Sequence, residues 1–218
     1  MAGISTFLVR PPKVVLDKNP LLLLLHGYGS NEADLFSFAS ELPDEYYVIS
    51  LQAPHDLSYG SYAWYSINFN ADASKFSDLD EARTSRTLLL TTLDELVQSY
   101  PIDKQSVTLI GFSQGAILSY AVALSEPERI QRVAALSGYL NTEIAVDGFA
   151  QNNFSSLRIF ASHGTVDQVI PVEWARKAPE TLAALGIKIQ FHEYPIGHGV
   201  SPQNFFDLKN WLNQTKVG

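Results

Sequence analysis

A serine between two glycines carries the clearest chemical signal in this sequence. The motif Gly111-Phe112-Ser113-Gln114-Gly115 joins residues 106–110, an apolar and β-branched stretch, to residues 114–124, which are nearly all apolar. The first stretch predicts a buried strand and the second a core helix. A strand that turns into a helix across G-x-S-x-G is typical of a nucleophile elbow, which lifts the serine hydroxyl above the sheet edge. A flanking glycine tolerates the strained backbone there because it has no Cβ.

A serine hydroxyl is a weak nucleophile near neutral pH, so it requires a base and a carboxylate that orients the base. With this type of elbow the acid follows the serine and the histidine comes last. His198, in a glycine-flanked loop between the last predicted strand and helix, is the predicted base. Asp167, in a turn beyond a predicted strand, is the predicted acid. Asp147 is the weaker alternative, because no convincing strand end precedes it.

The other four histidines are less suitable as the base. His26 and His55 precede the serine, and His192 lies inside a predicted strand. His163 follows the serine, but it directly ends a strand and lies close to the presumed acid.

The negative charge of a tetrahedral intermediate requires two backbone donors. The N–H of Gln114, the residue after the serine, is one candidate. The N–H of Tyr28 is the other, because His26-Gly27-Tyr28-Gly29 follows the strand predicted at residues 21–25.

Strands and helices alternate along the rest of the chain. This alternation predicts an α/β fold with a mostly parallel sheet, helices on both faces, and the site at the carboxyl ends of the strands. Residues 55–77 form a long irregular stretch rich in aromatic residues, which is typical of a functional or mobile loop. Strands are predicted at residues 21–25, 46–51, 106–110, 132–136, 157–161 and 187–194, an edge hairpin at 4–15, and helices at 32–42, 78–100, 114–124, 172–185 (kinked at Pro179) and 203–212.

Composition narrows the class of protein. The chain has 218 residues, which predicts one α/β domain over residues 1–218. A net charge of −8 argues against nucleic acid or an anionic membrane as the main partner. The absence of cysteine excludes disulfides and a thiol nucleophile and fits a cytoplasmic location. Residues 1–9 lack the features of a signal peptide, and the apolar run at 21–25 is too short to span a bilayer.

No cofactor or metal site is expected from the motifs. Gly27-x-Gly29 lacks the third glycine of a dinucleotide fingerprint, and Glu32 stands in its place. His192-Glu193 does not form a zincin motif, because the second histidine is misplaced and Pro195 interrupts the stretch.

With these residues in view, the chain resembles the phospholipase/carboxylesterase family of small serine hydrolases, which includes acyl-protein thioesterases. The resemblance runs from about residue 21 to residue 212. It implies a metal-free α/β-hydrolase without a large lid, with Ser113, Asp167 and His198 as its triad and Tyr28 and Gln114 as its oxyanion donors. It rests on Leu25-His26-Gly27-x-Gly29, Gln52-Ala53-Pro54, Trp64-Tyr65, Gly111-Phe112-Ser113-Gln114-Gly115, Ser137-Gly138, His163-Gly164-x-x-Asp167 and Gly197-His198.

Three departures from the family pattern fall near the expected substrate loop. Tyr28 replaces a frequent leucine and would narrow the acyl entrance; Tyr62-Ala63 replaces Pro-Ser before Trp64; and Ser66 follows Tyr65 where aspartate is common. Trp64, Tyr65 and Tyr62 are the candidate substrate contacts, with packing of the long loop as the alternative role.

Three functions follow from these residues. The first is a serine carboxylesterase that acts on small-molecule esters of short to medium acyl chain through an acyl-enzyme. The second is an acyl thioesterase or lysophospholipase with the same triad, whose acyl groove the aromatic residues at 59–69 would line. The third is a catalytically silent binding protein, against which the complete triad argues, and a peptidase is weaker still. An apolar surface near the site would support a homodimer, although the sequence does not locate it.

Overall fold

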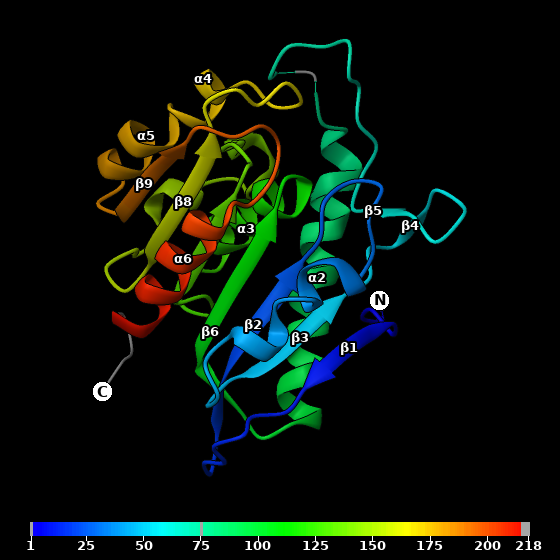
Figure 1. The fold of residues 1–218 in the computed structure, drawn as a ribbon, viewed down its shortest axis with the longest axis vertical. Coiled ribbons are helices and arrows are strands. Elements are labelled where there is room, and N and C mark those ends of the chain that lie inside the picture. Colours follow the sequence, from blue (N-terminus) through cyan, green and yellow to red (C-terminus); the bar gives the residue numbers. More distant parts are fainter. Residues whose placement is uncertain (1, 75, 215–218) are drawn as a thin grey trace.

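The structure of the chain is a computed structural model that describes residues 2–74 and 76–214. A twisted sheet of seven strands forms its centre, with helices on both faces (Figure 1). The strand order is β1-β3-β2-β6-β7-β8-β9, and the pairs are parallel except for β1 with β3. The predicted α/β class is therefore confirmed. The strands are β1 (Phe7–Arg10), β2 (Asn19–Leu25), β3 (Tyr47–Leu51), β6 (Ile102–Phe112), β7 (Arg132–Leu136), β8 (Arg158–Gly164) and β9 (Lys188–Tyr194).

The strands predicted within the sheet all form, three of them longer than predicted, and one prediction at the edge is wrong. β2 begins at Asn19 and β8 continues to Gly164. β6 is longer than predicted and lies centrally, between β2 and β7. The edge hairpin predicted at residues 4–15 is wrong: β1 forms there alone and pairs antiparallel with β3. β1 ends where Pro11 and Pro12 follow, because proline has no N–H to donate to a neighbouring strand.

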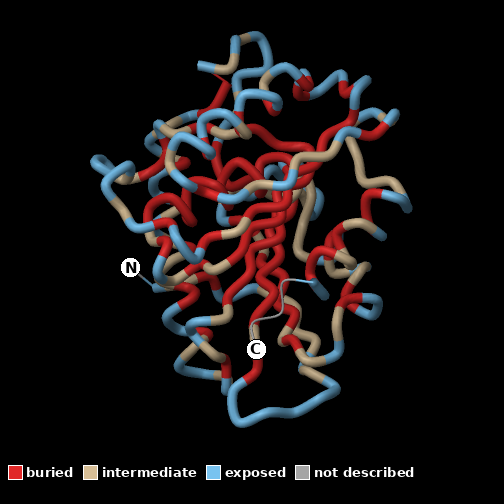
Figure 2. Tube along the Cα trace, turned by 90° about the vertical axis from the view of Figure 1, so that its left-hand side faces the viewer, coloured by how far each residue is buried: buried red, intermediate tan, exposed pale blue. Residues whose placement is uncertain are grey.

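Two helical layers cover the sheet, with α2, α3 and α5 on one face and α1, the 3₁₀ turn η1 and α6 on the other. Leu21, Leu23 and Leu25 face the first layer, whereas Leu22 and Leu24 face the second, which explains why residues 21–25 are all apolar. Figure 2 shows the buried strands between these layers. The helices are α1 (Ala33–Phe36), α2 (Leu79–Ser99), α3 (Gln114–Ser125), α4 (Val172–Ala175), α5 (Ala178–Ala184) and α6 (Pro202–Gln214), with 3₁₀ turns η1 (Ala39–Glu41), η2 (Thr142–Ile144) and η3 (Phe149–Gln151).

Two predicted helices are each divided into two shorter pieces. Residues 32–42 form α1 and η1, and at the break the Ser37 hydroxyl donates to the Asp34 carbonyl at 2.6 Å, competing with helical backbone bonding. Residues 172–185 form α4 and α5. Pro179 does not kink a continuous helix as predicted; it lies in the first turn of α5, where its missing N–H has no helical partner to lose.

The irregular stretch at residues 55–77 contains a small two-stranded sheet of β4 (His55–Asp56) and β5 (Tyr62–Ala63). Its tip projects from the body of the molecule (Figure 1). Three consecutive residues there, Ser58, Tyr59 and Gly60, have positive φ, and the Tyr59 side chain is fully exposed.

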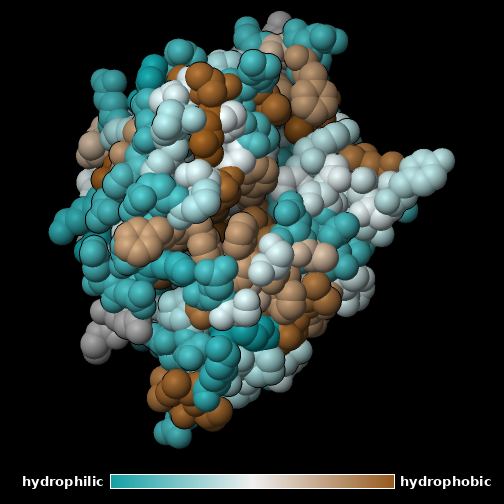
Figure 3. Space-filling model, viewed as in Figure 1, coloured by the Kyte–Doolittle hydropathy of each residue, from teal (hydrophilic) through white to brown (hydrophobic). Residues whose placement is uncertain are grey.

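The surface is polar with scattered apolar patches. The loop between β1 and β2 carries three adjacent exposed residues, Val14, Val15 and Leu16, and a brown patch lies at the same lower end of the molecule in Figure 3. Within residues 2–74 and 76–214, no helix combines the length and apolar character that crossing a bilayer requires.

Backbone packs directly on backbone at the turn from β6 to α3. A Cβ on Gly115 would lie 2.1 Å from the Leu25 carbonyl oxygen, and one on Gly111 would lie 2.3 Å from the Gly115 carbonyl oxygen. Both distances are far shorter than a van der Waals contact. The two glycines of the motif therefore allow α3 to begin against the end of β2.

We expect Gly115→Ala to destabilise the fold by about 3 kcal/mol, the upper end of the ~1–3 kcal/mol range for overpacking. The added methyl group would meet the backbone carbonyls of Leu25 and His26, which cannot move aside freely. Urea unfolding measures the effect. Gly199→Ala is the matched control, since no atom lies within 4 Å of a Cβ at that position. Equal stability of the two variants would contradict the packing argument.

Candidate active site

Ser113 occupies the sharp turn between β6 and α3. Its backbone φ of 53° and ψ of −116° lie outside the regions that residues with a Cβ favour. The Ser113 N–H donates to the Leu136 carbonyl at 2.8 Å, and the N–H groups of Ala116 and Ile117 donate to the Ser113 carbonyl at 3.0 and 3.1 Å. These bonds hold the strained turn and leave the hydroxyl at the carboxyl edge of the sheet.

The structure brings Ser113, His198 and Asp167 together. His198 Nε2 lies 2.9 Å from Ser113 Oγ, and His198 Nδ1 lies 2.7 Å from Asp167 Oδ2. Because a carboxylate only accepts hydrogen bonds, Nδ1 is assigned the proton and Nε2 accepts from the serine hydroxyl. In this geometry the imidazole can take the hydroxyl proton while the carboxylate stabilises the resulting positive charge.

Asp167 is buried, yet its surroundings favour the ionised form. Burial opposes ionisation, but hydrogen bonds from His163, His198 and the N–H groups of Ile170 and Val169 outweigh it and hold the pKa of Asp167 well below its usual range. The two backbone donors lie 2.9 and 2.8 Å from Oδ1. The carboxylate is therefore charged at neutral pH.

The loops that carry the acid and the base pack against each other. The Thr165 N–H donates to the Tyr194 carbonyl at 2.8 Å, which ties the acid loop to the end of β9. A Cβ on Gly164 would lie 2.2 Å from the Gly197 carbonyl oxygen. Gly164, the glycine after His163, therefore allows the two loops to approach closely.

A second residue with a strained backbone, Ser137 at the end of β7, supports the histidine loop. It has a φ of 53°, and its N–H donates to the Ser162 carbonyl at 2.8 Å. Its hydroxyl donates to the Gly199 carbonyl at 3.0 Å, directly beyond His198. The predicted Ser137-Gly138 motif thus holds the loop that carries the base.

The two predicted oxyanion donors lie in the loop after β2 and at the start of α3. Among the hydrogen bonds of the described residues, none uses the N–H of Tyr28 or of Gln114. Gly27 brings the first loop close to the serine, since a Cβ there would lie 3.3 Å from Ser113 Cβ. The N–H of Gln114 belongs to the N-terminus of α3, which favours negative charge.

His26 supports the loop that carries Tyr28. Its Nδ1–H donates to the Gly27 carbonyl at 2.7 Å, and its Nε2 accepts from the Ala53 N–H at 3.0 Å. Burial lowers the pKa of His26, so the ring is neutral and can accept this second bond. The order of the motifs alone excluded His26 as the base, but it did not reveal this supporting role.

Trp64 and Tyr65 do not line the site as predicted. Both side chains are completely buried, and the Gln114 side chain holds their backbone: the Trp64 N–H donates to Gln114 Oε1 at 2.8 Å, and Gln114 Nε2 donates to the Tyr65 carbonyl at 2.6 Å. Tyr62 is half-buried and exchanges backbone hydrogen bonds of 2.9 and 2.8 Å with Gly29 and Ser30. The Trp64 and Tyr65 side chains therefore pack inside the protein, which was the alternative role considered from the sequence, and Tyr62 pairs with the predicted oxyanion loop at residues 26–30.

The other candidates lie apart from the triad. Asp147, the alternative acid, follows η2, and none of the hydrogen bonds and ion pairs of the described residues joins it to His198. Among those residues, no group of three or more histidine, aspartate or glutamate side chains could hold a metal ion.

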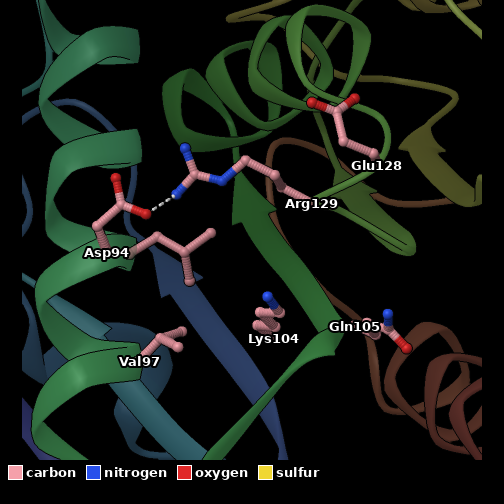
Figure 4. A pocket seen from close by; sticks show the side chains of 7 residues that line it. Asp94, Val97, Lys104, Gln105, Glu128 and Arg129 are labelled. Atoms are coloured by element: carbon pink, nitrogen blue, oxygen red, sulfur yellow. Dashed lines mark hydrogen bonds and ion pairs between the residues drawn. The ribbon is translucent and has the colours of Figure 1, made fainter.

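A surface hollow at the opposite end of the sheet is shown in Figure 4, between α2 and the start of β6. Asp94 and Arg129 form an ion pair of 2.6 Å at its edge, and Lys104, Gln105 and Glu128 are exposed polar residues of its rim. None of the triad residues lines it, so this hollow does not belong to the candidate site.

Asp167→Asn should lower stability at neutral pH by about 2 kcal/mol, because hydrogen bonds to a charged group contribute about 1.5–3 kcal/mol. The pKa of this carboxyl is lowered in the folded state, so its stabilisation is present above its unfolded pKa and is lost as the pH falls through the folded value. Urea unfolding of both proteins between pH 7 and pH 3 should show the difference shrinking toward acid. A difference that is constant with pH would argue against a charged Asp167.

Comparison with known proteins finds relatives and solved structures that match most or all of the chain. Acyl-protein thioesterase 1 of Mycosarcoma maydis is 26% identical over 98% of both chains. Acyl-protein thioesterase 1 of Debaryomyces hansenii is 26% identical over 69% of this chain and 66% of its own length. The crystal structure of esterase PE8 superposes with a TM-score of 0.84 at 25% identity and covers 99% of this chain and 100% of that one.

The family model described as phospholipase/carboxylesterase matches residues 12–216, nearly the whole chain. The relatives above are named as thioesterases or esterases, which agrees with the family match. The chain therefore belongs to the phospholipase/carboxylesterase family of hydrolases that act on ester bonds.

Proposed function

We propose that this protein is a serine carboxylesterase that hydrolyses short- to medium-chain carboxylic esters through an acyl-enzyme. One observation carries the proposal: an unbroken series of hydrogen bonds runs from Ser113 Oγ through His198 to Asp167, at 2.9 and 2.7 Å. In such a series the serine becomes a nucleophile without a metal or cofactor.

In the first half of the reaction, Ser113 Oγ attacks the ester carbonyl carbon and its proton moves to His198 Nε2. The N–H groups of Tyr28 and Gln114 donate to the oxyanion, each contributing about 10²–10³ in rate. The C–O bond to the alcohol then breaks. His198 returns the proton to the leaving oxygen, and the acyl group remains on Ser113.

In the second half, a water molecule replaces the alcohol. His198 takes one proton from the water as its oxygen attacks the acyl carbon. The tetrahedral intermediate collapses, the proton passes to Ser113 Oγ, and the carboxylic acid leaves. Asp167 remains a carboxylate throughout and stabilises the imidazolium in both halves.

A series of aromatic rings beside the oxyanion loop supports a preference for shorter acyl chains. The Tyr28 and Phe69 rings meet edge to face with centroids 5.6 Å apart, and Phe69 contacts Phe76 at 5.9 Å. Phe76 in turn contacts Trp174 of α4 at 5.5 Å. Rings packed in series occupy space that a long acyl chain would require.

An acyl thioesterase activity is the second candidate, because two relatives carry the name acyl-protein thioesterase 1. One of them matches this chain over almost its full length, and the other matches about two thirds of it. The same triad can attack a thioester, in which a thiol leaves in place of the alcohol. Acyl length and leaving group separate the two candidates.

Ser113→Ala should abolish the burst of p-nitrophenol from p-nitrophenyl butyrate and lower kcat by about 10⁴-fold or more, because no other group can form the acyl-enzyme. Stopped-flow absorbance measures the burst, and a fluorophosphonate probe labels the nucleophile. Ser99→Ala, at the exposed end of α2, is the matched control and should keep full activity. An unlabelled wild-type protein without turnover would instead favour a silent binding protein.

A panel of esters and thioesters of increasing chain length should give the highest kcat/KM for esters with acyl chains of about four to six carbons. Tyr28→Leu should raise kcat/KM for chains of about eight to ten carbons roughly tenfold relative to the shorter ones, because it removes the ring that contacts Phe69. Highest activity on long-chain thioesters, unchanged in Tyr28→Leu, would overturn both the ester assignment and the role of the rings.

A further inference from the structure

His163 is a buried histidine beside the triad for which the proposed reaction has no use. It lies near the end of β8, and its side chain and that of Asp167 are both inaccessible to solvent. Its Nε2 lies 2.8 Å from the Ile170 carbonyl oxygen and 3.3 Å from Asp167 Oδ2. Both oxygens accept hydrogen bonds, so Nε2 is assigned the proton; it donates to the Ile170 carbonyl and makes a longer charge contact with Asp167 Oδ2. The buried Nδ1 has no partner among the described residues.

The hydrogen bonds around Asp167 form a closed arrangement through a single residue, Ile170. The Ile170 N–H donates to Asp167 Oδ1 at 2.9 Å, while the Ile170 carbonyl accepts from His163. His163 also approaches Oδ2, the oxygen that accepts from His198. A rotation of the carboxylate would break bonds on both of its oxygens, so the bonds of His163 and Ile170 oppose such a rotation.

We propose that His163 is a positioning residue: its Nε2–H holds Asp167 Oδ2 in line with His198 and shares the charge of that carboxylate. This inference rests on the proposed function, in which His198 is the base. His163 touches neither substrate nor the reacting atoms, and it acts through Asp167 alone.

The charged groups near His163 and His198, other than Asp167, form ion pairs or hydrogen bonds with other residues. Glu193 pairs with His163 in the register of β8 and β9, and Arg176 binds it with bonds of 2.7 and 2.8 Å. Glu173 of α4 lies 3.8 Å from the same guanidinium, and Asp207 of α6 accepts from the Tyr194 hydroxyl at 2.8 Å. On its remaining sides His198 meets the Ser113 hydroxyl and the uncharged Phe112 ring, 5.0 Å away. Loss of His163 therefore acts on His198 chiefly through Asp167.

The test compares His163→Leu with His163→Gln. Glutamine has the same number of bonds from Cβ to its amide nitrogen as histidine has to Nε2, so it can keep the donor, whereas leucine fills the space without one. We expect His163→Leu to lower kcat about tenfold with KM within about twofold, because misdirection of a catalytic group affects the transition state more than substrate binding.

The pH profile separates positioning from general support of the fold. With one donor fewer, the carboxylate holds the proton on the His198 imidazole more tightly, so the acid limb of kcat/KM should move up by about half a pH unit in His163→Leu. His163→Gln should restore both kcat and the position of the limb. His192→Gln is the matched control, because His192 lies on β9, stacks on Phe160 and should leave the profile unchanged.

A readout without turnover distinguishes failure of this inference from failure of the proposed function. The proton between His198 Nδ1 and Asp167 gives a low-field ¹H NMR signal, which should move or broaden in His163→Leu and return in His163→Gln. If the wild-type protein hydrolyses no ester, the proposed function fails while the NMR comparison still tests His163. An acid limb and a low-field signal that stay unchanged in His163→Leu, or equal losses in both variants, would overturn the inference.

Discussion

The absence of side chains at two positions is the constraint on which the rest of the site depends. Gly111 and Gly115 let the start of α3 lie directly on the ends of β2 and β6, where any Cβ would meet a carbonyl oxygen at little more than 2 Å. This contact sets the strained turn at Ser113 and brings the loop that follows β2 beside it. The nucleophile and the oxyanion loop are thus located by the same backbone contact.

The polar groups beneath the site form a second level of support. The Gln114 side chain, whose backbone is a predicted oxyanion donor, fastens the segment at Trp64 and Tyr65 with two hydrogen bonds. His26 joins the oxyanion loop to Ala53 at the end of the neighbouring strand. A buried polar group without a partner costs about 1–3 kcal/mol, so these bonds favour one arrangement of the loops over its alternatives.

The sequence predicted the parts of the molecule that follow from periodicity and local motifs. The strands at residues 21–25 and 132–136 are nearly uniform apolar runs, and the elbow has a spacing that few other structures require. The order of serine, acid and histidine selected the three side chains that the structure brings together. These signals are local in the chain, so they depend on no contact between distant residues.

The predictions that were wrong depend on contacts between residues that are distant in the chain. Trp64 and Tyr65 look like substrate contacts because they are aromatic and lie in a long loop, but their burial depends on Gln114, far away in the sequence. The hairpin expected at residues 4–15 failed because the partner of β1 is β3. Likewise, the spacing of His163 and Asp167 was visible, but the bond to Ile170 that closes the arrangement was not.

The strand order has a consequence for how the chain reaches its native state. β6, β7, β8 and β9 are neighbours both in the sequence and in the sheet, so each can pair with the one before it over a modest loop. β2 and β6 also pair, but the whole stretch from Leu25 to Ile102 must be closed first. Closing a long loop loses chain entropy before any contact forms, which makes such pairings slow. Ser113, Asp167 and His198 all lie in the half of the chain that begins with β6, whereas Tyr28 follows β2. A newly synthesised chain therefore brings its nucleophile beside Tyr28 only when the two halves have joined.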